Sequence, residues 1–567
     1  MINRLETGIE RMEARLQDMG VKLIDDTLVD TTEAQLPALP IYESSEHETL
    51  AADPNSGLVF THGGVDGPPS LTSFLIPRSL ADVSTTGGFS VISQRGMEWI
   101  SQKAGKVSTE HLSALLLAKD DETNSGTPFV SPLPNRIFCP LPPMEEAISL
   151  LHDYIRDFNT ILPVFKRPEL VSLFTQDNLE MKFRSPSQWA SINAILATAL
   201  ILRPCQTDSQ KSWLFIQNAL EVVNELWLGP PDLLAVQSLL VIATFLLGTS
   251  AVQPCGYLVS TAIRLCHDLG LGNTEDKLPL SAEEAQHRQT IFWIAYWLDR
   301  ELCLRFGEPP TSSDDDFGAA LPMEAPTDSI YSIPTSDLSG NFNAFRSACQ
   351  LATIKGQLYQ DLYSATAVDR PIDEIISSVG TLDEKLQAWK KNIPTEYQPE
   401  SGNRTGSWQP TMSPILLLLH YSYFDCMIAI HRRVAAQGVH TGVDLLRRND
   451  LTPSPDTLSN PRVLLSASLC TKAARASISL TNYISREHTP LLGTLIYYPV
   501  VASITLSNCV IHNPQDICGS YYLQLVDHTE RFLASLSYYK YFDGIKRLVK
   551  QCAEYRSIAE AAIKAAL

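Results

Sequence analysis

Leu233-Leu234-Ala235-Val236-Gln237-Ser238-Leu239-Leu240-Val241-Ile242 is the stretch that decides the fold class of this chain of 567 residues. Its apolar residues do not alternate with polar ones, and the run is too long for a typical strand. It therefore predicts a helix that is buried on most of its surface. Because no convincing sheet pattern occurs elsewhere, the whole chain is predicted to be all-α, as a large multi-helix bundle or array.

Two more helices are predicted directly after this stretch. In residues 262–272 apolar side chains recur at helical spacing, and Gly270 can provide a left-handed stop. The next helix begins at Ser281, which reads as an N-cap because Glu284 follows three residues later. It ends before Gly307.

The order of these features resembles the middle homology region of fungal-specific transcription factors. That region is the large helical domain that accompanies Zn2Cys6 binuclear-cluster DNA-binding heads. The matching residues are Ala262-Ile263-Arg264-Leu265 with Asp268-Leu269-Gly270-Leu271, then Arg288, Phe292-Trp293 and Leu298-Asp299-Arg300, and finally Gly307-Glu308-Pro309 with the acidic run Asp314-Asp315-Asp316 and Leu321-Pro322. Flanking similarity extends the resemblance over residues 146–485. It implies a transcription regulator that acts in the nucleus.

Three regions are predicted along the chain. Residues 1–24 form a coiled-coil dimerisation helix, because apolar residues occupy every a and d position of three heptads. These seam residues are Ile2, Leu5, Ile9, Met12, Leu16, Met19 and Leu23. The alternative is an amphipathic helix that docks on its own protein. Residues 25–142 are predicted to be a disordered, acidic linker rich in Ser, Thr, Pro and Gly, and residues 143–567 are the helical regulatory domain.

One short patch in the predicted linker has a recognisable pattern. Leu112, Leu115 and Leu116 form an apolar face beside acidic residues, which is typical of segments that bind coactivators by laying a helix in a groove. The competing interpretation is that this leucine-rich segment folds back onto the domain.

Charge and cysteine spacing argue against direct DNA binding by this polypeptide. Its formal net charge is −19, and phosphate contacts need clustered Lys and Arg. The 11 cysteines are scattered without a Cys-x-x-Cys pair, so they predict no zinc cluster and no other cofactor. Zinc is expected only if a cysteine-rich head is encoded upstream. We interpret the cysteines as reduced core residues.

Four charged residues lie within otherwise apolar helices: Arg264, Arg288, Asp299 and Arg300. A buried arginine has to be paired, and an aspartate between aromatic turns is a natural partner. They are therefore predicted to form an internal ion-pair or hydrogen-bond network. The alternative is a site in which Arg264 or Arg288 holds an anionic effector.

An enzyme is the weakest interpretation, because the chain contains no phosphate loop, nucleophile elbow or zinc-protease motif. The aspartates 314–316 lack the helical spacing needed to bridge Mg²⁺, so they are predicted to form a solvated loop. Segments 233–252 and 414–430 approach the length of a membrane span but contain polar residues. They are predicted to be buried helices of a protein with no membrane partner.

Two functional hypotheses remain. The first is a zinc-cluster-type transcription regulator that controls a metabolic or biosynthetic gene set and contacts the transcription machinery or coactivators. It would act as a homodimer or as a heterodimer with related regulators, and would reach DNA only indirectly or through a missing N-terminal head. The second is a binding module without such a head, which modulates DNA-binding relatives by dimerising with them.

Overall fold

The computed structural model describes most of the chain from residue 138 onward. The described ranges are 138–175, 185–203, 206–248, 253–273, 280–324, 332–335, 340–368, 370–400, 412–447, 461–484, 492–536 and 543–566. Within these ranges the regular secondary structure is helical apart from one pair of very short strands, which confirms the predicted all-α class. The predicted coiled coil, the leucine patch and almost all of the predicted linker lie outside the described residues.

The first five described helices occupy residues 144–228. They are α6 (Met144–Asp157), α7 (Arg167–Thr175), α8 (Pro186–Ile201), α9 (Gln206–Glu221) and α10 (Val223–Leu228). α8 starts where it does because Ser185 and Gln188 form a capping box. Val222, with φ −100° and ψ 3°, separates α9 from α10, a break that the local sequence pattern does not show.

The stretch that decided the fold class forms α11 (Leu233–Leu247), which is buried from Ala235 to its end. It packs against α8 and against α12 (Gln253–Asp268). Gly270 has the predicted left-handed backbone, with φ 71°. The amides of Gly270 and Leu271 bond back to His267 and Cys266, which is the Schellman pattern.

α13 (Ala282–Phe306) is the helix that positions the candidate site. The Ser281 side chain accepts a hydrogen bond from the Glu284 amide at its start, and Gly307, with φ 66°, provides a left-handed end. From Ile291 onward every residue of the helix is buried, the charged ones included. Such a helix needs internal partners for its charges.

A small antiparallel pair, β1 (Ser332–Pro334) and β2 (Asn341–Asn343), follows α13. No sheet was predicted from the sequence, because three-residue strands are too short to show alternation. The Thr335 amide donates to the Gly340 carbonyl at 3.0 Å, beside the ends of the two strands. After β2 come α14 (Ala344–Leu358), the π-helical η4 (Tyr359–Tyr363), α15 (Ala365–Val368), α16 (Ile372–Lys391) and the short η5 (Thr395–Tyr397).

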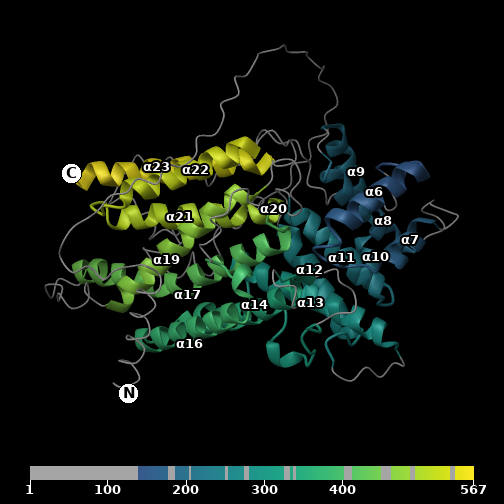
Figure 1. Ribbon diagram of the computed structural model, residues 1–567, viewed down its shortest axis with the longest axis horizontal. Helices are drawn as coiled ribbons and strands as arrows, with labels where there is room; N and C mark the ends of the chain where they lie inside the picture. The colour runs from purple at the N-terminus through teal and green to yellow at the C-terminus, as the bar shows by residue number, and fades with distance from the viewer. Residues whose placement is uncertain are drawn as a thin grey trace, which may run out of the picture. The chain divides into compact units, whose positions relative to one another are not determined.

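The C-terminal half is a stack of long helices. They are α17 (Pro414–Arg447), α19 (Pro461–Ser479) with η6 (Leu480–Tyr483), α20 (Leu492–Leu495), α21 (Tyr497–His512), α22 (Gly519–Leu536) and α23 (Asp543–Ala566). Figure 1 shows α16, α17, α19 and α21 lying in succession, with α22 and α23 beyond them. α17 continues past His431-Arg432-Arg433, where no proline stops it.

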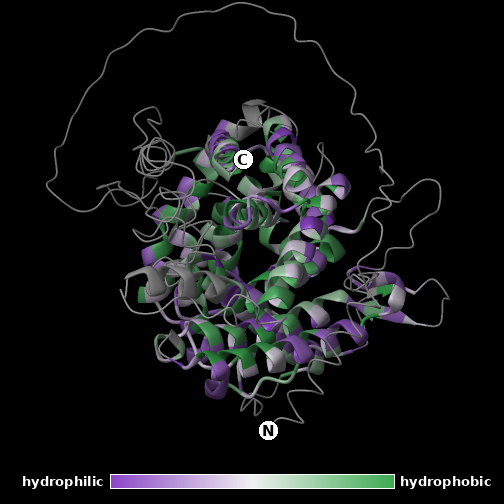
Figure 2. Ribbon diagram, turned by 90° about the vertical axis from the view of Figure 1, so that its left-hand side faces the viewer, coloured by the Kyte–Doolittle hydropathy of each residue, from purple (hydrophilic) through white to green (hydrophobic). Residues whose placement is uncertain are grey.

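Two helical segments in the described part of the chain are apolar and long enough to cross a membrane, Pro414–Ala435 and Leu492–His512. In their most apolar windows 89% and 94% of the residues are buried against other helices. Figure 2 shows hydrophobic segments running through the helices of the interior. The predicted segment at 233–252 is the shorter α11. These helices are therefore buried in the way that core helices of a helical domain are.

Candidate functional site

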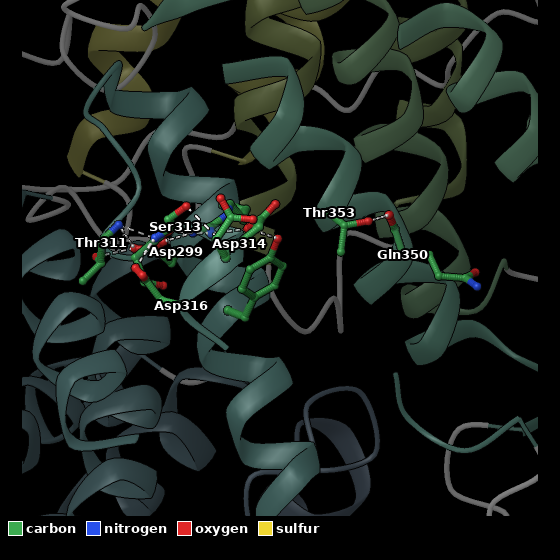
Figure 3. Close-up of polar contacts among 11 residues, drawn as sticks. Asp299, Thr311, Ser313, Asp314, Asp316, Gln350 and Thr353 are labelled. Atoms are coloured by element: carbon green, nitrogen blue, oxygen red, sulfur yellow. Dashed lines mark hydrogen bonds and ion pairs between the residues drawn. The ribbon is translucent and has the colours of Figure 1, made fainter. Parts of the chain in front are cut away.

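The candidate site lies where the segment 308–323, here called the strap, crosses the buried end of α13. Figure 3 shows Thr311, Ser313, Asp314 and Asp316 of the strap gathered beside Asp299. The Thr353 and Gln350 contact of α14 lies to one side. The strap is irregular except for the one-turn η2 (Asp314–Asp316). The aspartate run predicted as a solvated loop is therefore a capped turn, because the Ser313 side chain accepts from the Asp315 amide.

Asp299 fastens the start of the strap. Its carboxylate accepts from the Thr311 hydroxyl at 2.5 Å and from the Thr311 amide at 3.1 Å. It also accepts from the Arg300 guanidinium. Burial raises the pKa of Asp299, and the neighbouring Arg300 and the Thr311 hydrogen bonds oppose that effect.

Arg300 of α13 binds the middle of the strap through hydrogen bonds. Its guanidinium is fully buried, and one terminal nitrogen donates to the Ser312 carbonyl at 2.8 Å and to Asp314 at 2.6 Å. The Tyr296 ring stacks on the guanidinium at 4.2 Å, and the Tyr296 hydroxyl donates to the same Asp314 oxygen at 2.8 Å. Burial alone would lower the pKa of Arg300, but Tyr296 and the aspartates raise it.

The far end of the strap is held by aromatic packing. The Phe317 ring lies 5.0 Å from that of Phe292 and 5.2 Å from that of Tyr296. Beyond it, Trp293 and Gln289 both donate to the Ala320 carbonyl, at 2.8 and 2.7 Å. One face of α13 therefore binds the strap along most of its length.

A second buried network starts from the next residue of α13. The Glu301 carboxylate is 1% exposed and accepts from Lys355 of α14 at 2.5 Å and from the Tyr498 hydroxyl of α21 at 2.5 Å. It also accepts from Arg305, one turn further along α13, at 3.1 Å. Arg305 donates in turn to the Thr494 carbonyl at 3.2 Å. The network therefore joins α13 to α14, α20 and α21.

The charges of this second network stabilise one another. Burial alone would raise the pKa of Glu301, but Lys355 and Arg305 lower it to about 2. Arg305 also stacks on two tyrosine rings, at 4.3 Å from Tyr497 and 5.1 Å from Tyr498. Burial raises the pKa of the nearby Asp425 carboxyl on α17, although Lys355 opposes it.

The four charged residues singled out in the sequence end up in three places. Asp299 and Arg300 lie together under the strap. Arg288 is half-buried and donates to the Leu269 carbonyl at 2.9 Å, which ties α13 to the end of α12. Arg264 does not join a buried network: its side chain is 79% exposed and 3.8 Å from Asp268. The prediction that Arg264 is buried in an internal network was wrong, because this residue lies on the outer face of α12.

The sequence did not identify Asp314, Glu301, Arg305 or Lys355 as members of a network. The spacing of Glu301 and Arg305, one helical turn apart in an apolar helix, was the available signal. No local signal marked Lys355 as a partner of Glu301, because it lies 54 residues further along the chain in another helix. Among the described residues no group of His, Cys, Asp and Glu could hold a metal ion.

Comparison with known proteins shows which protein family this chain resembles. Residues 151–391 match the model of the fungal specific transcription factor domain. The chain is 36% identical over 531 residues to the ABC-transporter-regulating transcription factor of Aspergillus oryzae. That alignment covers 91% of this chain and 58% of the relative.

Other relatives carry similar names. A protein of Aspergillus fumigatus, also named ABC-transporter-regulating transcription factor, is 34% identical over 92% of this chain and 59% of its own length. The Fusaridione A cluster transcription factor fsdR of Fusarium heterosporum is 32% identical over 54% of this chain and 58% of its own length. The chain spans less than two thirds of the length of each of these relatives.

Proposed function

We propose that this chain, which contains a fungal specific transcription factor domain, is the regulatory part of a zinc-cluster-type transcription regulator that acts in the nucleus. The observation that carries the proposal is the similarity of nine tenths of the chain, at 36% identity, to a protein named as a transcription factor. The helical domain would receive or transmit the regulatory signal. DNA recognition would come from a zinc cluster outside this sequence, because the cysteines of this chain are not spaced to form one.

The target genes are proposed to include genes for ABC transporters. Two relatives that align with more than nine tenths of this chain are named for regulating such transporters. The alternative, a biosynthetic gene set, has support from a relative that aligns with about half of it. Transcript levels after deletion of the gene distinguish the two: a loss confined to a biosynthetic cluster would favour the alternative.

The site favours a regulatory role over catalysis. The charged groups described above bind one another and the backbone, so their role in the proposal is to fix the strap and the helices around α13. Asp299, Arg300 and Arg288 would contribute structure first. Use of Arg264 or Arg288 to hold an anionic effector is the less favoured alternative, because Arg288 already donates to the Leu269 carbonyl and Arg264 lies 3.8 Å from the Asp268 carboxylate.

Tethering the chain to a heterologous DNA-binding domain in a fungal host tests the proposal. We expect activation of a reporter gene. Replacing Leu112, Leu115 and Leu116 by Ala should lower that activation at unchanged protein level, if the patch binds a coactivator. Normal abundance with a silent reporter would count against a transcription regulator.

The second candidate function is that of a module that dimerises with DNA-binding relatives. The heptad pattern of residues 2–23 favours it. Replacing Ile9 and Leu16 by Asp should shift the mass in light scattering toward monomer, because charge is unfavourable in a coiled-coil seam. The isolated chain should not bind DNA specifically in a mobility-shift assay at about 0.15 M salt. An unchanged mass would place the dimer interface elsewhere.

A further inference from the structure

The strap contains three consecutive hydroxyl side chains, and each is followed three residues later by an aspartate. The pairs are Thr311 with Asp314, Ser312 with Asp315, and Ser313 with Asp316. A hydroxyl with carboxylates shortly after it is the pattern that acid-directed protein kinases bind, because their substrate grooves are basic. The acidic run alone does not distinguish the three hydroxyls, but their contacts do.

Only one of the three is available to a kinase. The Thr311 hydroxyl is held by Asp299 at 2.5 Å. Ser312 is buried, with 8% of its surface exposed. Ser313 is exposed, and its hydroxyl oxygen caps η2, accepting a long bond of 3.4 Å from the Asp315 amide. Replacing that bond costs little, because a distance of this length lies at the edge of hydrogen-bond geometry.

Ser313 also stands at the point where the strap is locked to α13. Its two neighbours, Ser312 and Asp314, are the acceptors of one terminal nitrogen of Arg300, at 2.8 and 2.6 Å. Arg300 is fully buried, and its Nε has no hydrogen-bond partner. A new anion on Ser313 would therefore arise between the two residues that accept hydrogen bonds from the Arg300 guanidinium.

We propose that Ser313 is a phosphorylation site for an acid-directed protein kinase, and that the phosphoryl group releases the strap from α13. In the transfer, the Ser313 hydroxyl oxygen bonds to the γ-phosphorus of ATP, the bond from that phosphorus to the bridging oxygen breaks, and ADP leaves. The hydroxyl proton passes to the kinase. The modification itself does not depend on the proposed function.

The direction of the effect follows from the local charges. A phosphoserine adds a charge of about −1.5 to −2 at neutral pH. Asp299 and Asp314 already bind Arg300, and Asp315 and Asp316 follow in the same turn of the strap. The phosphate competes with Asp314 for Arg300 and repels the remaining carboxylates. The strap is therefore less tightly bound, and Phe317 leaves its contact with Phe292 and Tyr296 more often.

The test is phosphorylation of the purified chain with ATP and a kinase that requires an acidic residue three positions after the hydroxyl. Phosphopeptide mapping should place the phosphate of the strap on Ser313, and S313A should remove it. D316N should slow modification of Ser313 by about tenfold, equivalent to roughly 1.4 kcal/mol. The matched control D315N, with the same chemical change one residue earlier, should slow it less.

Hydrogen exchange then tests the release. Peptides from the strap should exchange faster in the phosphorylated chain than in the unmodified one, while peptides from α21 should exchange at the same rate. Circular dichroism confirms that the variants are folded. The site is overturned if Ser313 stays unmodified, or if D316N and D315N are modified equally fast. Equal or slower exchange of the strap overturns the release.

Discussion

Glu301 balances two buried cations, which makes it the residue with the largest expected effect on stability. Its carboxylate contacts Lys355, Arg305 and the Tyr498 hydroxyl, and both cations are at most 2% exposed. A buried ion pair contributes little compared with a well-packed apolar group, but removing one partner leaves the other charge unpaired in the interior. Lys355 and Arg305 would both lose their anion at once.

E301Q should therefore lower the free energy of unfolding by about 3–5 kcal/mol. Adding K355M should recover part of that loss, because it removes one of the unpaired cations. Chemical denaturation measures both changes. The matched control is E283Q, whose side chain is 76% exposed and 3.7 Å from Lys166, and its cost should stay below about 0.5 kcal/mol. A similar cost for the two glutamines would contradict the interpretation.

His287 gives the stability a dependence on pH. Burial lowers the pKa of His287 to about 4 from 6.5, with a further contribution from Lys166. Glu284 opposes the shift, and Glu169 lies 3.8 Å from the ring. Because the folded pKa lies below the unfolded one, the unfolded chain takes up a proton first as the pH falls. The contribution of His287 is therefore present above pH 6.5 and is lost as the pH falls toward 4.

We expect H287Q to flatten the change in the unfolding temperature between about pH 6.5 and pH 4.5, since it removes up to about 3 kcal/mol of proton linkage. Thermal melts at several pH values measure this. The control H152Q changes an exposed histidine, and its unfolding temperature should depend on pH as it does in the parent chain. If the H287Q profile is as steep as that of the parent, protonation of His287 does not destabilise the fold.

At the scale of the elements, α20 touches the end of α11 through two glycines. A Cβ on Gly493 would lie 2.3 Å from the Cα of Gly248, a distance that real Cβ atoms do not adopt. The two backbones can approach this closely only because neither residue has a side chain. This contact brings the neighbouring Thr494 carbonyl to Arg305.

G493A should therefore destabilise the chain by about 2 kcal/mol or more, because one of the two elements has to move. G380A is the control, since a Cβ on Gly380 in α16 meets nothing within 4 Å. It should be neutral or should stabilise by up to about 1 kcal/mol through the higher helix propensity of alanine. Denaturant midpoints compare the two variants. Equal midpoints would show that α20 can shift without cost.

At the scale of the whole molecule, the family match and the folded unit do not coincide. The match ends at residue 391, whereas the buried charges of α13 find partners at Thr494 and Tyr498. The helices beyond residue 400 also cover α14 and α16, which pack against α17. Residues 138–400 alone would thus expose apolar faces and leave Arg305 without its carbonyl partner.

A fragment of residues 138–400 should accordingly not unfold cooperatively. Differential scanning calorimetry should show a sharp transition for residues 138–567 and a broad or missing one for the fragment. Limited proteolysis should cut the fragment throughout its helices. A sharp transition in the fragment would establish the N-terminal half as an independent domain.

The sequence by itself determined the helices of this protein and several of their ends. The apolar run of α11, the Ser281 cap and the stops at Gly270 and Gly307 all use interactions within a few residues, so they are visible in the local pattern. The sequence did not predict β1, β2 or the break at Val222, because such short features leave no periodic pattern of apolar residues.

Only the tertiary structure decided which charges are buried together. Arg264 and Arg300 both lie in apolar helices, yet one faces outward and the other is fully buried, a difference set by the neighbours of each helix. Lys355 and Tyr498 reach Glu301 from 54 and 197 residues away. Periodicity reports which face of a helix is apolar, but pairing between distant helices depends on how those faces pack, and that information is not local.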